Sequence, residues 1–592
     1  MRSKRLTQSE KLYKDALDIL RSIDVIPQSH EHYLAMILNN LALLYKDTQR
    51  VSDAERMQNE ALEVYRRLAD ANPQAYEHYV AMMLMNLGTI YYHTKCYSDA
   101  EEKFKEALDI YRRLAHDDSL AYKPQVAMML INLANVYGDT QRFSESEKLL
   151  LEAYEINLSL AKDDPLAYEP NLALNLTILA SLYKNSQRYP ESEQKYKEAL
   201  EILCRLSDVN PLAYESEFAM ALTDLADLYR EIQRITEAEQ MYQQALTIYS
   251  RFVKDNPQVY EQKMADVLNG IAILCYDTQQ FVKAEKMYDK ALEIYHRLAK
   301  DNPRVYEPNL VNIMSNLANV YKETQRLAEC ERICREVVEI RRRLAKDNPL
   351  VYEPSLALSL NNLAGLYRDT QRYTEADMIN SEAYEIRQRL AKTNPQVHNP
   401  DLAITCCNWG LMKIGIDQLF EAVQLFEECR QILGEMNMRT TDQQYSYNTS
   451  LLFLGRIYTF SNNYSNAYKA YEELLPLLKE RFDEASEQKR TEYLQSLGNQ
   501  TYVCIMMKEY VKAEQYAREV LSLDSTQHWI ISNLAATLLF QGKYAEAKKL
   551  YIQYKDDLKN DFLDDLKMYA KAGIIPKEWD EDVEKIEKIL EQ

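Results

Sequence analysis

Small residues recur at a fixed interval along this chain. Alanine or glycine occupies nine positions spaced 46 residues apart, namely Ala42, Gly88, Ala134, Ala180, Ala226, Ala272, Ala318, Ala364 and Gly410. A fixed period of about 20 to 50 residues is typical of a solenoid, in which each repeat buries its apolar face only against its neighbours. The period therefore predicts one elongated array of repeats.

The residues within each repeat predict α-helices. The 592 residues include only 11 glycines and 16 prolines. In residues 307–349, apolar side chains recur at intervals of three and four on both sides of a short break, which is typical of two amphipathic helices. We expect these helices over residues 308–321 and 328–346, joined by loops of about 4 to 6 residues that make them antiparallel. The predicted fold is all-α.

Prolines follow the same interval and are expected to mark helix ends. They fall at Pro27, Pro73, Pro165, Pro211, Pro257, Pro303, Pro349 and Pro395, with Ser119 at the remaining position. Asparagine or aspartate usually precedes them, and a residue before proline disfavours the α conformation. Each Asn-Pro pair therefore predicts the end of one repeat.

The repeat pattern predicts four regions. Residues 9–22 align with the second helix at 100–113, so residues 1–26 form a half repeat. Residues 27–435 form about nine regular repeats, and residues 436–556 form about three divergent ones. Residues 557–592 are predicted capping helices, because terminal repeats need a polar outer face. The half repeat at the start leaves two hypotheses, a preceding segment or end-to-end association of two copies.

Composition argues against several functional classes. A formal net charge of -20 disfavours nucleic-acid binding, which depends on lysine and arginine. Nine cysteines, an odd number without regular spacing, are typical of reduced thiols in a cytoplasmic protein. The sequence shows neither a signal peptide nor a membrane-spanning run. It also lacks glycine-rich phosphate loops, and Cys330 and Cys334 have no second pair to complete a metal site. We therefore expect no enzyme activity, cofactor or metal.

The repeats resemble a known family. The string Asn316-Leu317-Ala318-Asn319-Val320-Tyr321, and Asn86-Leu87-Gly88 followed by Ala100, Phe104 and Ala107, resemble the tetratricopeptide repeat. The usual repeat has about 34 residues. These longer repeats are most similar to those of kinesin light chains and of bacterial proteins built alike. The resemblance implies a right-handed superhelix of about twelve helix pairs.

The resemblance also implies where a ligand would bind. In this family the first helix of each repeat lines a concave groove, and peptides lie there. The implied groove residues are Asn39, Met82, Met85, Thr89, Met128, Asn135, Thr177, Ser181, Thr223, Asp227, Asn269, Asn312, Asn319 and Asn361. Methionine adapts to irregular apolar partners, and asparagine can both donate to and accept from a peptide backbone.

In this family, adaptors that bind the C-terminal carboxylate of a chaperone carry lysine or arginine at the inward-facing positions of successive first helices. The equivalent positions of this sequence hold no lysine or arginine, which argues against such a site. The nearest basic residues each stand directly after a tyrosine that recurs near the end of the first helix, at Lys46, Lys184, Arg230, Lys322 and Arg368. They either guide an acidic segment along the groove edge or are ordinary charges at helix C-termini.

The predicted function is that of a protein-interaction scaffold or peptide-binding adaptor that holds a partner polypeptide in the groove. The alternative is the sensor or recruitment half of a larger signalling system, with its effector upstream or on another chain. The divergent junction near Trp409 is a second candidate binding region.

Overall fold

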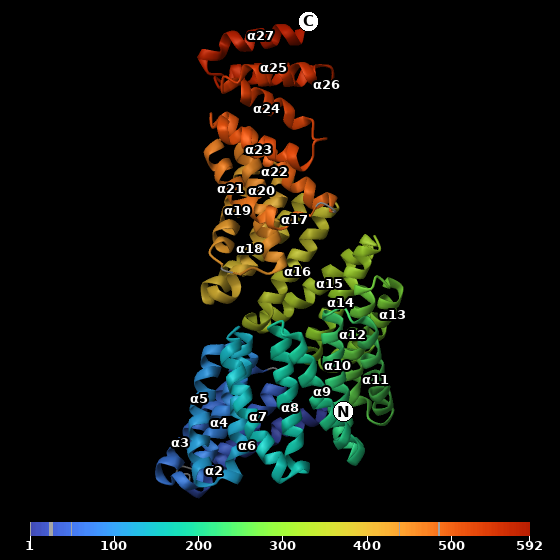
Figure 1. Cartoon of the computed structure of the whole chain (residues 1–592). Helices are drawn as coiled ribbons and strands as arrows, with labels where there is room; N and C mark the ends of the chain where they lie inside the picture. The colour runs from blue at the N-terminus through green and yellow to red at the C-terminus, as the bar shows by residue number, and fades with distance from the viewer. Residues whose placement is uncertain (1, 23–27, 49, 437, 484–485, 592) are drawn as a thin grey trace. The chain divides into compact units, whose positions relative to one another are not determined.

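The computed structural model describes residues 2–22, 28–48, 50–436, 438–483 and 486–591 of the chain. Within these residues it contains 27 α-helices, one short 3-10 helix and no β-strand. Helices that follow one another in the sequence pack side by side (Figure 1). The predicted all-α solenoid of antiparallel helix pairs is therefore confirmed. The predicted boundary at residues 26 and 27, including Pro27, lies outside the described residues.

Twelve helix pairs, which we number as repeats 1 to 12, follow one another along the chain. Their first helices are α2 (Gln28–Asp47), α4 (Pro73–His93), α6 (Ser119–Asp139), α8 (Pro165–Asn185), α10 (Pro211–Glu231), α12 (Pro257–Asp277), α14 (Pro303–Glu323), α16 (Pro349–Asp369), α18 (Pro395–Gly415), α20 (Thr441–Phe460), α22 (Glu487–Met506) and α24 (Trp529–Phe540). Their second helices are α3 (Val51–Ala71), α5 (Tyr97–Asp117), α7 (Phe143–Asp163), α9 (Tyr189–Val209), α11 (Ile235–Asp255), α13 (Phe281–Asp301), α15 (Leu327–Asp347), α17 (Tyr373–Thr393), α19 (Leu419–Gly434), α21 (Tyr464–Glu480), α23 (Tyr510–Leu523) and α25 (Tyr544–Gln553). Helix α1 (Arg2–Arg21) precedes them, and α26 (Lys555–Lys571), a 3-10 helix (Lys577–Trp579) and α27 (Asp580–Glu591) follow.

The chain divides into two compact units. The N-terminal unit is Met1–Ser359 and the C-terminal unit is Leu360–Gln592, with the division inside α16. In the C-terminal unit a single hydrophobic core extends from the end of α17 to α27, and it includes Phe426, Tyr471, Phe562 and Ile586. Helices α26 and α27 pack against α24 and α25.

The helices are longer and the loops shorter than the sequence indicated. The two helices of repeat 7 each contain 21 residues, and the first begins at Pro303 instead of Pro308. Pro308 lies inside α14, where it removes one backbone hydrogen bond. The added first turn buries Tyr306 next to Tyr295, with ring centroids 6.5 Å apart, and this packing offsets the lost bond. The expected loops of four to six residues are in fact three residues within a repeat and one residue between regular repeats.

The single residue between repeats ends one helix and begins the next. The backbone N–H of Asn72 donates to the carbonyl oxygen of Leu68 at the end of α3, and its side chain accepts from the N–H of Ala75 in α4. Asp118, Asp164 and Asn210 accept the same capping bond in the next three repeats. Proline or serine follows at the first helical position, where proline costs no hydrogen bond. The predicted helix stops at Asn-Pro are thus confirmed.

The three-residue turn inside each repeat depends on a left-handed residue. Gln187 has φ 60°, and it lies between Ser186 and Arg188. The N–H of Arg188 donates to the carbonyl oxygen of Tyr183 and that of Gln187 to Lys184, which together cap the end of α8. Equivalent residues with positive φ are Lys95, Gln141, Gln233, Gln279, Gln325, Gln371 and Asp417.

The small residues at 46-residue intervals face large side chains of the second helix. Ala180 and Ala226 are fully buried, and so is Gly88. A Cβ atom on Gly88 would lie 2.7 Å from the ring of Phe104, and one on Gly410 would lie 2.7 Å from Phe426. The close approach of the two helices therefore requires a small residue at this column.

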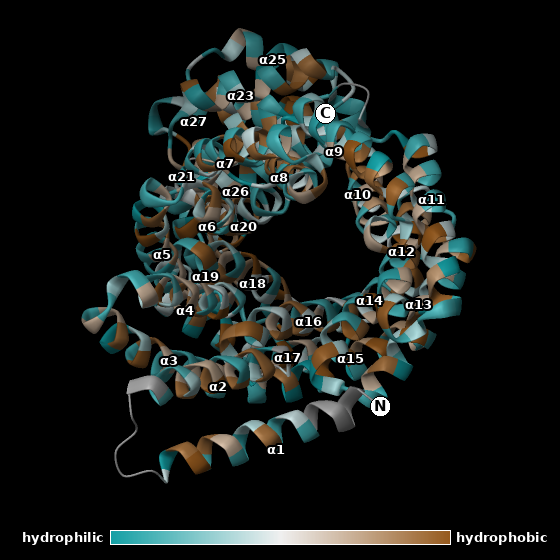
Figure 2. Ribbon diagram, turned by 90° about the horizontal axis from the view of Figure 1, so that it is seen from below, coloured by the Kyte–Doolittle hydropathy of each residue, from teal (hydrophilic) through white to brown (hydrophobic). Residues whose placement is uncertain are grey.

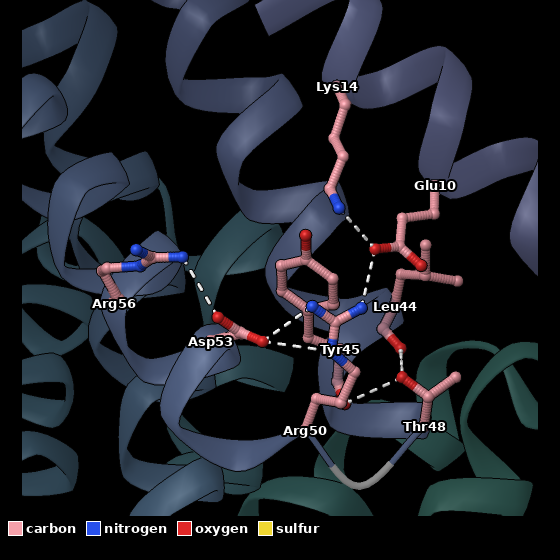
Figure 3. A network of polar contacts seen from close by, with 8 residues as sticks. All are labelled: Glu10, Lys14, Leu44, Tyr45, Thr48, Arg50, Asp53 and Arg56. Atoms are coloured by element: carbon pink, nitrogen blue, oxygen red, sulfur yellow. Dashed lines mark hydrogen bonds and ion pairs between the residues drawn. The ribbon is translucent and has the colours of Figure 1, made fainter.

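Neighbouring repeats are joined by a cluster of tyrosine, arginine and glutamate. In its first copy, Arg50 stacks 4.1 Å above the ring of Tyr45 and its guanidinium group contacts Glu10 of α1 at 2.6 Å and Asp53 at 2.7 Å (Figure 3). Lys14 contacts the same Glu10 carboxylate at 2.8 Å. We call the tyrosine, the arginine and the glutamate of the preceding second helix the Tyr-Arg-Glu cluster. Further copies contain Tyr137, Arg142 and Glu101; Tyr183, Arg188 and Glu147; and Tyr229, Arg234 and Glu193.

Candidate functional site

The first helices of the N-terminal unit form its inner surface. Figure 2 shows α10, α12 and α14 on the inside of the curve of this unit, and α11, α13 and α15 on its outside. The one-residue and three-residue connections keep this alternation constant from repeat to repeat, because each repeat contributes 46 residues in the same order. Equivalent positions on successive first helices therefore share the inner surface.

An apolar column runs along this inner surface. Met36, Met128, Leu174 and Met220 occupy the same position in their repeats, and 41%, 49%, 50% and 44% of their side chains are exposed. In repeats 6 and 7 the column becomes polar, with Asp266 and Asn312, both exposed. The inner surface thus changes from thioether and aliphatic side chains to side chains that form hydrogen bonds.

The predicted groove residues differ in how much of each side chain solvent can reach. Asn39 is buried, and its carboxamide oxygen accepts a hydrogen bond of 2.9 Å from Asn86 of the next repeat. Met128, Asn312 and Asn319 are exposed. The others are half-buried, namely Met82, Met85, Thr89, Asn135, Thr177, Ser181, Thr223, Asp227, Asn269 and Asn361.

Several of these polar groups already have partners in the fold. Asn316 donates to the carboxamide oxygen of Asn269 at 3.2 Å, as Asn86 does to Asn39. In the C-terminal unit Asn361 donates to the hydroxyl of Thr405 at 2.8 Å. The hydroxyls of Thr89, Thr177 and Thr223 each donate to a carbonyl oxygen four residues earlier in their own helix. These threonines therefore present mainly acceptor lone pairs to a ligand.

Repeats 5 and 6 contribute an acidic stretch. Burial raises the pKa of Asp224 to about 6, and the charge of Asp227 adds to the increase. Asp266 keeps part of its surface exposed, but neighbouring groups desolvate its carboxylate and raise its pKa to about 6, although the hydroxyl of Tyr295 donates to this carboxylate. Tyr242 donates in the same way to Asp227. Asp224 was not among the predicted residues, and the only available signal was that it replaces an asparagine found at this column in other repeats.

The five predicted basic residues lie in different environments. Arg230 forms an ion pair with Asp277 at 3.0 Å, and Arg368 forms one with Asp369 at 2.9 Å. Lys46 and Lys184 are half-buried, and Lys322 is exposed. Within the N-terminal unit, Lys46, Lys184, Arg230 and Lys322 thus differ in exposure and in ion pairing.

A buried arginine beneath the inner surface was missed by the sequence reasoning. Arg341 of α15 is 5% exposed and donates a hydrogen bond of 2.8 Å to Asn312, a predicted groove residue. It occupies the column that holds Tyr249 and Tyr295 in the two preceding repeats. That change from tyrosine to arginine was the available signal.

The C-terminal unit has a hollow of its own. Its volume is about 1000 Å³, and its lining includes Arg368, Leu411, Ile414, Tyr445 and Phe453. Trp409, the predicted second binding region, is not part of this lining. Its indole N–H donates to Asp377 at 2.7 Å and its ring packs against Tyr384, so Trp409 supports the fold next to the hollow.

The described residues contain neither a metal centre nor a membrane span. No group of three or more histidine, cysteine, aspartate or glutamate side chains is arranged there to hold an ion. None of the helices in this part of the chain combines the length and apolar character needed to cross a bilayer.

Stacked helix pairs that expose apolar and hydrogen-bonding side chains on their first helices define a helical-repeat protein. Three family models described as tetratricopeptide repeat match the chain, the first over residues 79–159, the second over 34–74, 218–256, 310–349 and 356–396, and the third over 450–485. The chain is a tetratricopeptide-repeat protein. Repeats of this family mediate protein–protein interaction, and scaffolds built from them are generally not enzymes.

Solved structures of similar proteins were also found. BtubC (BKLC) from P. vanneervenii is 21% identical, and the match covers 43% of this chain and 93% of that one with a TM-score of 0.36. The apo form of RapI is 15% identical, with coverage of 53% and 99% and a TM-score of 0.38. No curated protein sequence matches the chain.

Proposed function

We propose that this protein is a peptide-binding adaptor that holds an extended segment of a partner protein along the inner surface of the N-terminal unit. The observation that supports this proposal best is the exposed column of Met36, Met128, Leu174 and Met220. Exposing flexible apolar side chains at equivalent positions of successive helices costs hydration free energy, and methionine is over-used at surfaces that bind varied apolar partners.

The polar groups beside this column suit a polypeptide. Asn135 and Asn319 carry both donors and acceptors, which an extended backbone can pair with along its length. The acidic stretch at Asp224, Asp227 and Asp266 adds a region that favours a basic side chain of the ligand. We further propose that the partner is a protein and not a nucleic acid, because the net charge of -20 opposes phosphate binding.

We also propose that the protein is cytoplasmic. Its nine cysteines are free thiols. Cys407 and Cys429 are both buried, and the thiol of Cys429 donates to the carbonyl oxygen of Ser446 at 3.8 Å. Free thiols in this number are typical of a reducing compartment.

The test is affinity capture from native cytosol with the full chain and with an inner-surface variant, Asn135→Ala combined with Asn319→Ala. The matched control is Gln240→Ala combined with Gln244→Ala, which removes two exposed carboxamides from α11 on the outside of the unit. We expect the inner-surface variant to lose partners that the wild type and the control both retain. Identical sets of captured proteins from all three chains would contradict binding at the inner surface.

A second pair of variants tests the apolar column. Met128→Asp combined with Met220→Asp places charges on the exposed column, whereas Val282→Asp places one on α13, where 82% of the valine is exposed. The proposal predicts that the first change abolishes capture and that the second does not. Equal capture by both variants would show that the methionine column is not part of the binding surface.

A further inference from the structure

Arg341 has hydrogen-bond partners but no acidic partner. Its guanidinium group donates to the carbonyl oxygen of Ser355 at 2.6 Å, to the hydroxyl of Ser359 and to the carboxamide oxygen of Asn312 at 2.8 Å. All three acceptors are neutral, and among the described residues no carboxylate forms an ion pair with it. Its Nε atom is buried without a hydrogen-bond partner. The positive charge is therefore held inside the protein without compensation.

The next repeat shows how this site looks when the charge is compensated. Arg387 stands 46 residues after Arg341 and is equally buried, at 4% exposed, with its Nε atom also lacking a partner. Its guanidinium group lies 2.6 Å from the carboxylate of Asp401. Asp401 stands 46 residues after Ser355. The two sites thus differ by one carboxylate: α18 places Asp401 against Arg387, whereas α16 places Ser355 at the equivalent position against Arg341.

The missing carboxylate has an energetic consequence. Removing a guanidinium ion from water is strongly unfavourable, and this cost is offset only by an opposite charge or by saturated hydrogen bonds. Burial lowers the pKa of Arg341 to about 10, and no nearby charge opposes that shift. At Arg387 the charge of Asp401 does oppose it. Arg341 is therefore a buried cation that lacks the negative partner which Asp401 provides to Arg387.

The inner surface gives a ligand access to this charge. Asn312, which accepts from the Nη2 atom of Arg341, is exposed on the same column as Met220 and Asp266. Asn312 thus connects the buried guanidinium group to the surface on which a ligand would lie. A single buried positive charge matches a monovalent carboxylate, and the resulting charge-assisted hydrogen bonds are about twice as strong as those to neutral groups.

We propose that Arg341, together with Asn312 and Ser359, binds the carboxylate of an acidic residue in the protein segment that occupies the inner surface. This inference rests on the proposed peptide-binding function and names the class of partner, a segment with aspartate or glutamate opposite repeat 7. The apolar column of repeats 1 to 5 and the acidic stretch of repeats 5 and 6 precede this site along the same surface.

The experiment uses a library of random dodecapeptides displayed on phage and selected on the immobilised full chain. The selection is repeated with Arg341→Met, which replaces the buried charge by an apolar side chain of similar length. It is also repeated with Ser355→Asp, which places a carboxylate beside Arg341 at the position that Asp401 occupies beside Arg387. The matched control is Arg343→Met, the same chemical change two residues away at an arginine that pairs with Glu307 and is 61% exposed. Circular dichroism checks that each variant is folded.

We expect peptides selected on the wild type to be enriched in aspartate or glutamate at one position. A synthetic peptide of the selected consensus should bind at least about tenfold more weakly to Arg341→Met and to Ser355→Asp, and equally well to Arg343→Met. Changing its acidic residue to the amide should weaken binding to the wild type and leave binding to Arg341→Met unchanged. The Ser355→Asp chain should also unfold at a higher temperature than the wild type.

Four outcomes would overturn the proposal. Selected peptides without an acidic residue, or equal binding by the wild type and both site variants, would reject the carboxylate site while leaving peptide binding intact. Displacement of the bound peptide by inorganic phosphate and not by glutamate would assign the charge to a phosphate ligand. Failure to select any peptide on the wild type would reject the proposed function itself, and the carboxylate site with it.

Discussion

The hydroxyl group of Tyr183 donates a hydrogen bond of 3.0 Å to Glu147, which lies 36 residues earlier in the preceding repeat. Arg188 stacks 4.2 Å above the same tyrosine ring and contacts the same carboxylate at 2.9 Å. One glutamate of α7 therefore joins the first helix and the turn of the following repeat. In a solenoid, where each repeat contacts only its neighbours, such links carry much of the coupling between repeats.

Removing the glutamate should weaken this link. We expect Glu147→Ala to lower the stability of repeats 3 and 4 by about 1 to 2 kcal/mol, because Tyr183 and Arg188 both lose a charged acceptor while the partly exposed site limits the effect. Hydrogen exchange of peptides from α7 and α8 measures the local change. The control is Glu201→Ala, at an exposed position of α9. Equal protection in the two variants would show that the cluster does not couple the repeats.

Repeat 2 keeps the tyrosine and the glutamate but lacks the arginine, so the cluster can be completed there by substitution. In repeat 2, Tyr91 donates to Glu55 at 3.0 Å, but Cys96 occupies the position of Arg188. We expect Cys96→Arg to stabilise this repeat by about 0.5 to 1 kcal/mol, through stacking on Tyr91 and pairing with Glu55. Thermal unfolding of Cys96→Arg and of Cys96→Met separates the guanidinium effect from the loss of the thiol. A lower melting temperature for the arginine variant than for the methionine variant would contradict the expectation.

The small residues at 46-residue intervals predict that a larger side chain at one of these positions clashes with the facing helix. A second substitution, of the facing residue, should relieve this clash. Gly410→Ala places a Cβ atom 2.7 Å from the ring of Phe426, which is too close for van der Waals contact. We expect a loss of about 1 to 3 kcal/mol from overpacking. Adding Phe426→Leu should recover part of that loss, because repeat 3 pairs Ala134 with Leu150 at the same positions. Urea unfolding of the single and double variants gives the coupling energy. Additive effects would show that the contact is not the cause.

The raised pKa of Asp224 predicts that replacing this residue by asparagine stabilises the folded chain at neutral pH but not at acidic pH. In the folded chain this pKa is about 6, above its ordinary value of 3.8. The folded state therefore disfavours the charged form, and the penalty is fully present above pH 6 and disappears as the pH falls toward 3.8. We expect Asp224→Asn to stabilise the chain by about 1 to 2 kcal/mol at pH 7 and hardly at all at pH 4.

Melting temperatures of Asp224→Asn and of the wild type across that pH range test this prediction. The control is Asp109→Asn, at an exposed position in the middle of α5, which should show no such pH dependence. A gain of equal size at pH 4 and pH 7 would mean that the asparagine acts through packing alone. The substitution restores the residue found at this column as Asn86, Asn132 and Asn316.

The repeat period allowed most of the architecture to be predicted. Ala180 and Gly410 lie where helices meet closely, and Asn72 and Asn210 lie between repeats, because these positions depend on local sterics and backbone hydrogen bonds. The helix lengths were harder to predict from the sequence. Pro308 suggested a helix start, but packing of Tyr306 in the preceding turn outweighs its missing hydrogen bond.

The candidate site was only partly accessible from the sequence. The column of Met128 and Met220 could be placed by counting, since equivalent positions in a regular solenoid share a face. That Asn39 is buried against Asn86 could not, because hydrogen bonds between repeats depend on the offset of one helix relative to the next.

The sequence by itself determined that the chain is a helical solenoid and which positions line its first helices, because a regular period fixes backbone geometry repeat after repeat. Only the tertiary structure decided that Arg341 is buried among neutral acceptors while Arg387 faces Asp401. Both arginines stand at the same position of their repeats, so their sequence register is identical. Their difference arises from which side chain the following helix places against each guanidinium group, and in a buried site that single neighbour decides whether the charge is compensated.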